Sequence, residues 1–78
     1  MPTLSIRLST INDVKDFVHI VNQCPYDIDL ISGRYIVDAK SIMGIFSLDL
    51  TKPIQVHIHQ EECDDLISAL DQWRVSGN

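Results

Sequence analysis

Three histidines are the side chains in this sequence that could hold a metal ion, because imidazole is a common ligand of zinc. His57 and His59 alternate with apolar residues, so they share the polar face of a predicted strand. His19 falls in a predicted helix, about 150° from the centre of its apolar face at 100° per residue, and is expected to point to solvent. We therefore expect the histidines on opposite surfaces, and the sequence predicts no metal site.

The possible nucleophiles are not arranged for catalysis. Cys24 and Cys63 have no neighbouring histidine in the sequence, and Cys63 falls on the apolar face of a predicted helix, where thiols are usually inert. Two cysteines are too few for a disulfide framework, so both are expected to be reduced. The three glycines are too scattered for a phosphate-binding loop. We expect neither an enzyme nor a cofactor-binding protein.

Ser41 opens a short apolar segment around which the other elements are arranged. The hydroxyl of Ser41 is expected to cap a helix by accepting a hydrogen bond from a backbone N–H of its first turn. Ile45 and Leu48 are expected to pack in the core. The helix nevertheless has more apolar surface than so short an element can easily bury, so it is either fixed to the core or offered to a partner. The segment reads Lys40-Ser41-Ile42-Met43-Gly44-Ile45-Phe46-Ser47-Leu48.

Apolar residues recur with strand and helix periods along the chain. Alternation with period two predicts four strands, at residues 4–8, 26–31, 35–37 and 54–58. The turn between the second and third strands is expected at Ser32-Gly33-Arg34. Thr10 is expected to cap the first helix, which Pro25 ends. Its apolar face is expected to comprise Ile11, Val14, Phe17, Val18 and Val21. The last helix is expected to begin at residues 60–62, with its inner face formed by Cys63, Leu66, Ile67, Leu70 and Trp73.

The order of the elements, β-α-β-β-α-β-α, predicts an α+β fold. Strands with one apolar face indicate an antiparallel sheet that is covered by helices on one side only. A chain of 78 residues without repeats or linkers is expected to form one domain over residues 1–78, with a frayed end at residues 76–78.

Charge and hydropathy exclude several classes of partner. The net charge is −5, and the six lysines and arginines are scattered, which argues against a nucleic-acid groove. The chain has neither a signal-like N-terminus nor an apolar run that could span a membrane. We therefore expect a cytoplasmic protein whose partners are other proteins.

The Ser41 segment resembles the regulatory serine segment of the HPr family, the histidine phosphocarriers of the bacterial sugar phosphotransferase system. The order of strands and helices is also similar to that family's open-faced sandwich, which implies the sheet order 1-4-2-3. The correspondence covers essentially the whole chain. By this resemblance Ser41 is the candidate phosphosite, and Ile42, Met43 and Phe46 are the candidate partner-binding residues. A phosphate at Ser41 would lie at a helix start, which favours negative charge. The residues alone leave open whether Ser41 is only a cap.

The same alignment departs from the family at its phosphorylation site. HPr proteins carry Gly-x-His-Ala-Arg-Pro-Ala at the start of the first helix, whereas this chain has Thr10 at the histidine position and Asn12 at the arginine position. Threonine is a far poorer phosphoryl acceptor than imidazole, and Asp13 adds negative charge where a phosphate would approach. The resemblance therefore implies a variant without phosphocarrier activity, like the catabolite-repression variants of HPr.

The implied function is a regulatory or protein-interaction module that acts through the Ser41 helix. Its partners would be an HPr kinase, a transcriptional regulator or components of the phosphotransferase system. Two alternatives remain open: a phosphocarrier with an unrecognised acceptor, and a scaffold that binds one partner constitutively. Ile31, Ile36 and Tyr35 are expected on the face of the sheet away from the helices, which leaves both a monomer and a weak homodimer open.

Overall fold

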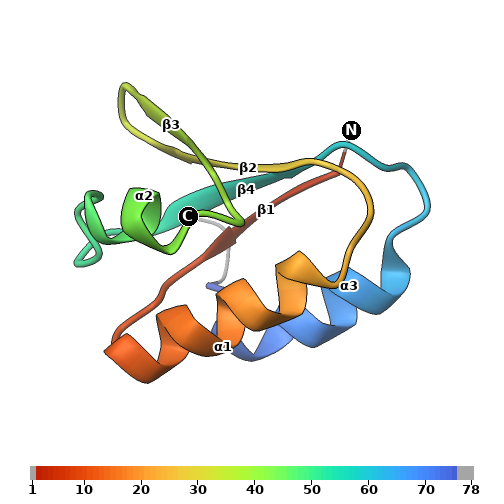
Figure 1. Cartoon of the computed structure of the whole chain (residues 1–78), viewed down its shortest axis with the longest axis horizontal. Coiled ribbons are helices and arrows are strands. Elements are labelled where there is room, and N and C mark those ends of the chain that lie inside the picture. The colour runs from red at the N-terminus through yellow and green to blue at the C-terminus, as the bar shows by residue number, and fades with distance from the viewer. Residues whose placement is uncertain (1, 76–78) are drawn as a thin grey trace.

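The computed structural model describes residues 2–75, and in them a four-stranded antiparallel sheet forms one layer with three α-helices on one of its faces (Figure 1). The strand order is β1-β4-β2-β3, as expected. The strands are β1 (Thr3–Ile6), β2 (Ile28–Ser32), β3 (Tyr35–Asp38) and β4 (Ile54–Ile58). The helices are α1 (Ile11–Asn22), α2 (Ile42–Phe46) and α3 (Asp64–Leu70), and a 3₁₀ helix, η1 (Asp71–Trp73), follows α3. The expected frayed end at residues 76–78 lies outside the described residues.

Alternation along the strands places the core on one face of the sheet. In the central strand β4, Ile54, Val56 and Ile58 are fully buried, whereas Gln55 is exposed. Val56 lies opposite both Leu4 of β1 and Leu30 of β2, so the three strands bury side chains at the same level. The predicted period-two pattern is therefore confirmed for the inner strands.

The hairpin between β2 and β3 turns through two residues, Gly33 and Arg34, which lie between the paired Ser32 and Tyr35. Gly33 has a φ of +59°, a conformation that L side chains rarely adopt. A positive φ at the first turn position matches the twist of a tight hairpin. The turn predicted from Ser32-Gly33-Arg34 is confirmed.

The two edges of the sheet are not alike. At β1 the chain after η1 returns and pairs with the strand: Val75 N–H donates to the Ser5 carbonyl (3.0 Å), and Arg74 forms a bridge with Ile6. The N–H of Arg7 donates to the Trp73 carbonyl at 2.9 Å. The β1 edge is therefore partly closed by the end of the described chain, and β3 forms the opposite edge.

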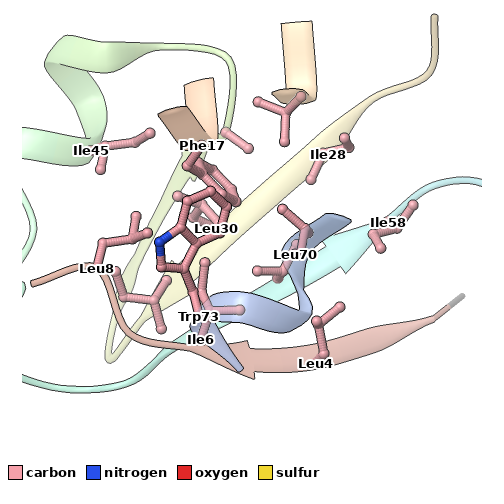
Figure 2. Close-up of a cluster of buried hydrophobic side chains, with 14 of the residues drawn as sticks. Leu4, Ile6, Leu8, Phe17, Ile28, Leu30, Ile45, Ile58, Leu70 and Trp73 are labelled. Atoms are coloured by element: carbon pink, nitrogen blue, oxygen red, sulfur yellow. The ribbon is translucent and has the colours of Figure 1, made fainter. Parts of the chain in front are cut away.

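The core lies between the sheet and the helices (Figure 2). Phe17 of α1 is fully buried, and its ring meets the ring of Trp73 edge-on, with centroids 6.0 Å apart and an interplanar angle of 73°. This geometry is one that aromatic pairs prefer. The pair joins the first helix to the end of the described chain.

Tyr35 was expected on the face of the sheet away from the helices, which is wrong. It pairs with Ser32, and its neighbour Ile36 pairs with Ile31, so Tyr35 lies on the face that the helices cover. The second strand, expected from residue 26, begins at Ile28.

Three further sequence expectations need correction. Ile11 is 63% exposed, because the buried residues of α1 centre on Val14, Phe17 and Val21 and Ile11 lies about 90° from that direction at 100° per residue. The last helix begins at Asp64, because residues 60–63 are not helical and the backbone of Cys63 has a φ of −137° and a ψ of 32°. Strand β1 ends at Ile6, although Leu8 is fully buried as its alternation suggested.

Candidate functional site

The start of α1 is closed by reciprocal hydrogen bonds between Thr10 and Asp13. The Asp13 N–H donates to Thr10 Oγ1 (3.0 Å), which confirms Thr10 as the helix cap. In return, Asp13 Oδ2 accepts from the N–H groups of Thr10 (3.2 Å) and Ser9 (3.0 Å). This capping box satisfies backbone donors that a helix otherwise leaves unpaired. Asn12 is exposed beside it.

Electrostatics at this turn disfavour a second anion. The hydrogen bond from the Ser9 N–H lowers the pKa of Asp13 below its usual value, and hydrogen bonds with the Trp73 side chain and with Thr10 lower it further. Asp13 is therefore ionised at neutral pH, and its carboxylate occupies the Ser9 and Thr10 N–H donors that an incoming phosphate would use. The capping box therefore occupies three backbone donors of this turn, those of Ser9, Thr10 and Asp13.

Ser41 caps α2 in the same way that Thr10 caps α1. Its Oγ accepts from the Gly44 N–H at 3.2 Å, and the residue is exposed. A Cβ at Gly44 would lie 3.3 Å from Ser41 Oγ and 3.3 Å from Val37 Cβ. Glycine at this position therefore lets α2 approach both the cap hydroxyl and β3 closely.

The apolar residues of the α2 segment divide into two groups. Ile45 is fully buried and Leu48 is 8% exposed, so these two hold the segment to the core as expected. Met43 is 80% exposed and Phe46 is 43% exposed. Ile42 is half-buried and packs against the core cluster, so it contributes less to the exposed surface than the other two candidate partner-binding residues.

Lys40 fixes the approach to Ser41, which the sequence did not indicate. Its Nζ donates to the Cys24 carbonyl just after α1 (2.7 Å), and its backbone N–H donates to Asp38 Oδ1 (2.9 Å). Lys40 is thus attached at the end of α1 opposite to Thr10, so the two capped turns are separate sites. The sequence shows only that a lysine precedes the cap residue. It does not indicate that this lysine binds a backbone carbonyl 16 residues away.

Cys63 and Tyr26 are other groups that could react. Burial raises the pKa of the Cys63 thiol, and burial together with a hydrogen bond to Cys24 raises the pKa of Tyr26 to about 12. Neither group is activated as a nucleophile. Both cysteines are free thiols.

The histidines lie on separate elements. His19 is exposed on α1 next to Gln23, whereas His57 alternates with the buried residues of β4 and faces away from the helices. His59 Nε2 lies 2.8 Å from Asp29 Oδ2. Within residues 2–75, no cluster of three or more histidine, cysteine or acidic side chains could hold a metal ion, and no helix has the length and hydropathy to cross a membrane.

Comparison with protein families gives one match. Residues 13–73 match the family model described as the PTS HPr component phosphorylation site. The matched segment includes the Ser41 helix and begins three residues after Thr10, so it does not bear on Thr10 or Asn12. No curated protein sequence matches the chain.

Solved structures of HPr proteins share the fold. HPr-C-His from Thermoanaerobacter tengcongensis is 23% identical, with a TM-score of 0.77, over 92% of this chain and 89% of that chain. The phosphocarrier protein HPr from Bacillus anthracis is also 23% identical, with a TM-score of 0.72, over 95% and 96%. The histidine-containing phosphocarrier protein of a mycoplasma is 15% identical, with a TM-score of 0.74, over 91% and 89%.

Proposed function

The chain belongs to the HPr family of the bacterial sugar phosphotransferase system, and from this membership we propose that it is a regulatory, protein-binding member that acts through the α2 segment around Ser41. In this proposal the start of α1 does not carry phosphoryl groups, and the protein is not an enzyme. The observation that carries the proposal is the exposed Ser41 at the start of α2, with Met43 and Phe46 exposed beside it. At the start of α1, by contrast, the Asp13 carboxylate accepts from the N–H of the cap residue Thr10 itself.

The closed turn supports the loss of phosphocarrier activity. If Thr10 stands at the family's histidine position, as the sequence resemblance implies, the acceptor there is a hydroxyl that already receives the Asp13 N–H. A reversible phosphocarrier needs a nucleophile such as imidazole, whose phosphoryl derivative transfers readily. The Asp13 carboxylate, 3.0 Å from the Ser9 nitrogen, also repels an anionic phosphoryl group.

The exposure of Ser41 supports it as the modified residue. Its hydroxyl is exposed and is held in place by the Gly44 N–H. A phosphate on this oxygen would add negative charge and strong acceptors beside Met43 and Phe46. A partner that recognises the apolar residues and the phosphate together would then bind only the modified protein.

The direct test is incubation of the protein with an HPr kinase and ATP, followed by intact-mass and peptide mass spectrometry. We expect one phosphoryl group, located on Ser41, and none on the Ser41→Ala variant. Thr10→Ala is the matched control, because it removes the other cap hydroxyl and should still accept the phosphate. The regulatory proposal fails if the wild-type protein remains unmodified while a serine-containing HPr in the same mixture is phosphorylated.

A second experiment separates this proposal from a phosphocarrier. The protein is incubated with phosphoenolpyruvate and the first enzyme of the phosphotransferase system, with a histidine-containing HPr as the positive control. We expect no acid-labile phosphate on this chain. Acid-labile phosphate on this chain would contradict the proposed loss of carrier activity, and its position would identify the acceptor residue.

The constitutive scaffold makes a different prediction about binding to a partner. In that case Ser41→Ala binds as well as the wild type, whereas Met43→Asp abolishes binding. In the regulatory proposal, Ser41→Ala has no binding that depends on the kinase, and Met43→Asp weakens binding of the phosphorylated protein. A pull-down with and without the kinase distinguishes the two.

A further inference from the structure

A hollow lies at the end of the molecule where the tip of the β2–β3 hairpin, the end of α2 and the loop before β4 come together (Figure 1). Its volume is about 460 Å³, within the range of about 300–1,000 Å³ that is usual for small-molecule sites. The side chains that line it come from all three segments, and most of them are exposed. They are Ser32, Arg34, Tyr35, Ser47, Asp49 and Lys52.

Two cations in the hollow are available to bind an anion. Within residues 2–75, the Arg34 side chain forms neither an ion pair nor a hydrogen bond. Lys52 Nζ lies 4.0 Å from Asp49 Oδ2, and the lysine side chain is 75% exposed. A guanidinium can hold a phosphate with two parallel N–H donors, and an ammonium adds a compact charge. Two cations with one carboxylate leave the hollow net positive on a chain whose net charge is −5.

Asp49 adds a second requirement for the ligand. Hydrogen bonds to its Oδ1 from the Thr51 hydroxyl (2.5 Å) and from the Thr51 N–H (3.0 Å) lower the pKa of Asp49, so the carboxylate is ionised at neutral pH. Among the described residues, only the Lys52 ammonium lies near Oδ2. An ionised carboxylate repels a bare phosphate but accepts hydrogen bonds from hydroxyl groups. A ligand that carries both a phosphate and hydroxyls would therefore satisfy the cations and the carboxylate together.

The rest of the lining suits the body of such a ligand. The Tyr35 side chain is 71% exposed, and its ring offers an apolar face with a hydroxyl at one end. Ser47 Oγ donates to the Gly44 carbonyl at 2.6 Å, so its lone pairs can accept from a hydroxyl of the ligand.

We propose that this hollow binds a phosphate monoester of a polyhydroxy compound, the chemistry that sugar phosphates and nucleotides share. The phosphate would bind Arg34 and Lys52, and a hydroxyl would donate to Asp49. This proposal does not depend on the function proposed for Ser41, which lies at the opposite end of α2.

An amide NMR titration is the first test, with AMP, glucose 6-phosphate and methyl phosphate as separate probes. We expect a Kd of about 0.1–1 mM for AMP, glucose 6-phosphate or both. Methyl phosphate carries the same anionic group without hydroxyls, and should bind at least about tenfold more weakly because the hydrogen bond to the carboxylate is lost. The shifted amides should lie at residues 32–35 and 47–52.

The two larger probes distinguish the source of the phosphate monoester. Tighter binding of AMP would identify a nucleotide whose base stacks on Tyr35, and equal or tighter binding of glucose 6-phosphate would identify a sugar phosphate. The proposal is overturned if neither probe saturates below about 10 mM, if methyl phosphate binds equally well, or if the shifts centre on another part of the chain.

Arg34→Gln tests the phosphate contact, and Lys15→Gln is its matched control. Both variants lose one positive charge from an exposed side chain, but Lys15 lies on α1 outside the hollow. Arg34→Gln should raise the Kd of the better probe at least about tenfold, whereas Lys15→Gln should change it less than about twofold. An equal loss in the two variants would show attraction by overall charge alone and would overturn the site. The amide spectra without ligand check that both variants fold.

Asp49→Asn tests the requirement for hydroxyls. Asparagine keeps an Oδ1 acceptor for Thr51 but removes the negative charge, so methyl phosphate should bind this variant more tightly than it binds the wild type. The ratio of the Kd of methyl phosphate to that of the better probe should fall from at least about tenfold to below about threefold. A ratio equal to that of the wild type would overturn the assignment of Asp49 as the hydroxyl acceptor.

Discussion

Asp13 decides what the first turn of α1 can bind. Its carboxylate accepts from two backbone N–H groups, and its own N–H donates to Thr10, so the turn is closed by the chain itself. The same residue types at a helix start can equally leave donors open for an anion. Here the Asp13 carboxylate, three residues after the cap residue Thr10, takes two of those donors.

Asp13 should give the protein a measurable acid sensitivity. Its pKa is lowered in the folded state, so its contribution to stability is present above the unfolded-state pKa of about 3.9 and is lost as the pH falls through the folded-state pKa. Asp13→Asn should therefore be less stable than the wild type at pH 6, and the difference in melting temperature should shrink toward pH 2. Thermal unfolding followed by circular dichroism measures both.

Asp16→Asn controls for the loss of one negative charge from α1. Its side chain is exposed and lies outside the capping box, so the effect should be smaller than that of Asp13→Asn at pH 6. If the stability difference between Asp13→Asn and the wild type stayed constant from pH 6 to pH 2, the carboxylate would not be the source of the capping energy.

Helix α2 depends on its packing more than on its own sequence. Five residues are too few for a helix that is stable alone, so its position comes from the Ser41 cap, the Lys40 attachment and the burial of Ile45. The exposed side of the helix is therefore free to vary without loss of the fold. This is the arrangement that a partner-binding segment needs.

Two substitutions on α2 should show that its buried side stabilises the fold and its exposed side does not. Ile45→Ala removes a fully buried side chain and should lower the free energy of unfolding by about 2–4 kcal/mol. Met43→Ala changes a side chain that is 80% exposed and should change it by less than about 0.5 kcal/mol. Urea unfolding followed by circular dichroism measures both, and a loss at Met43 as large as that at Ile45 would contradict the division.

Local patterns predicted most of these elements, and long-range contacts account for what they missed. Period-two alternation identified the strands, and a threonine and a serine before apolar runs identified both caps, because these signals depend on neighbours in the chain. The reciprocal bond from Asp13 could have been predicted from its place three residues after Thr10. The Lys40 bond to the Cys24 carbonyl could not, since it joins a side chain to a backbone group 16 residues away.

At the scale of the molecule, the end of the described chain completes the fold. The segment after η1 pairs with β1, and Trp73 packs against Phe17 (Figure 2). Residues from the two ends of the chain therefore share one core. In a domain with a radius of gyration of 11.2 Å, such a shared core favours unfolding in a single cooperative step.

The fluorescence of Trp73 should follow the unfolding of the whole domain, and the packing of Phe17 against Trp73 should contribute to the free energy of unfolding. Trp73 is the only tryptophan in the chain and is 7% exposed, so its fluorescence should change at the same denaturant concentration as the far-UV circular dichroism. Phe17→Ala should lower the free energy of unfolding by about 3–5 kcal/mol, because it leaves a cavity beside the indole. Phe46→Ala is the matched control: its ring is 43% exposed, and the loss should be at most about 1–2 kcal/mol. Separate midpoints for fluorescence and circular dichroism would show instead that the Phe17–Trp73 contact opens before the sheet unfolds, and that the pairing of the chain's end with β1 is a distinct unit of stability.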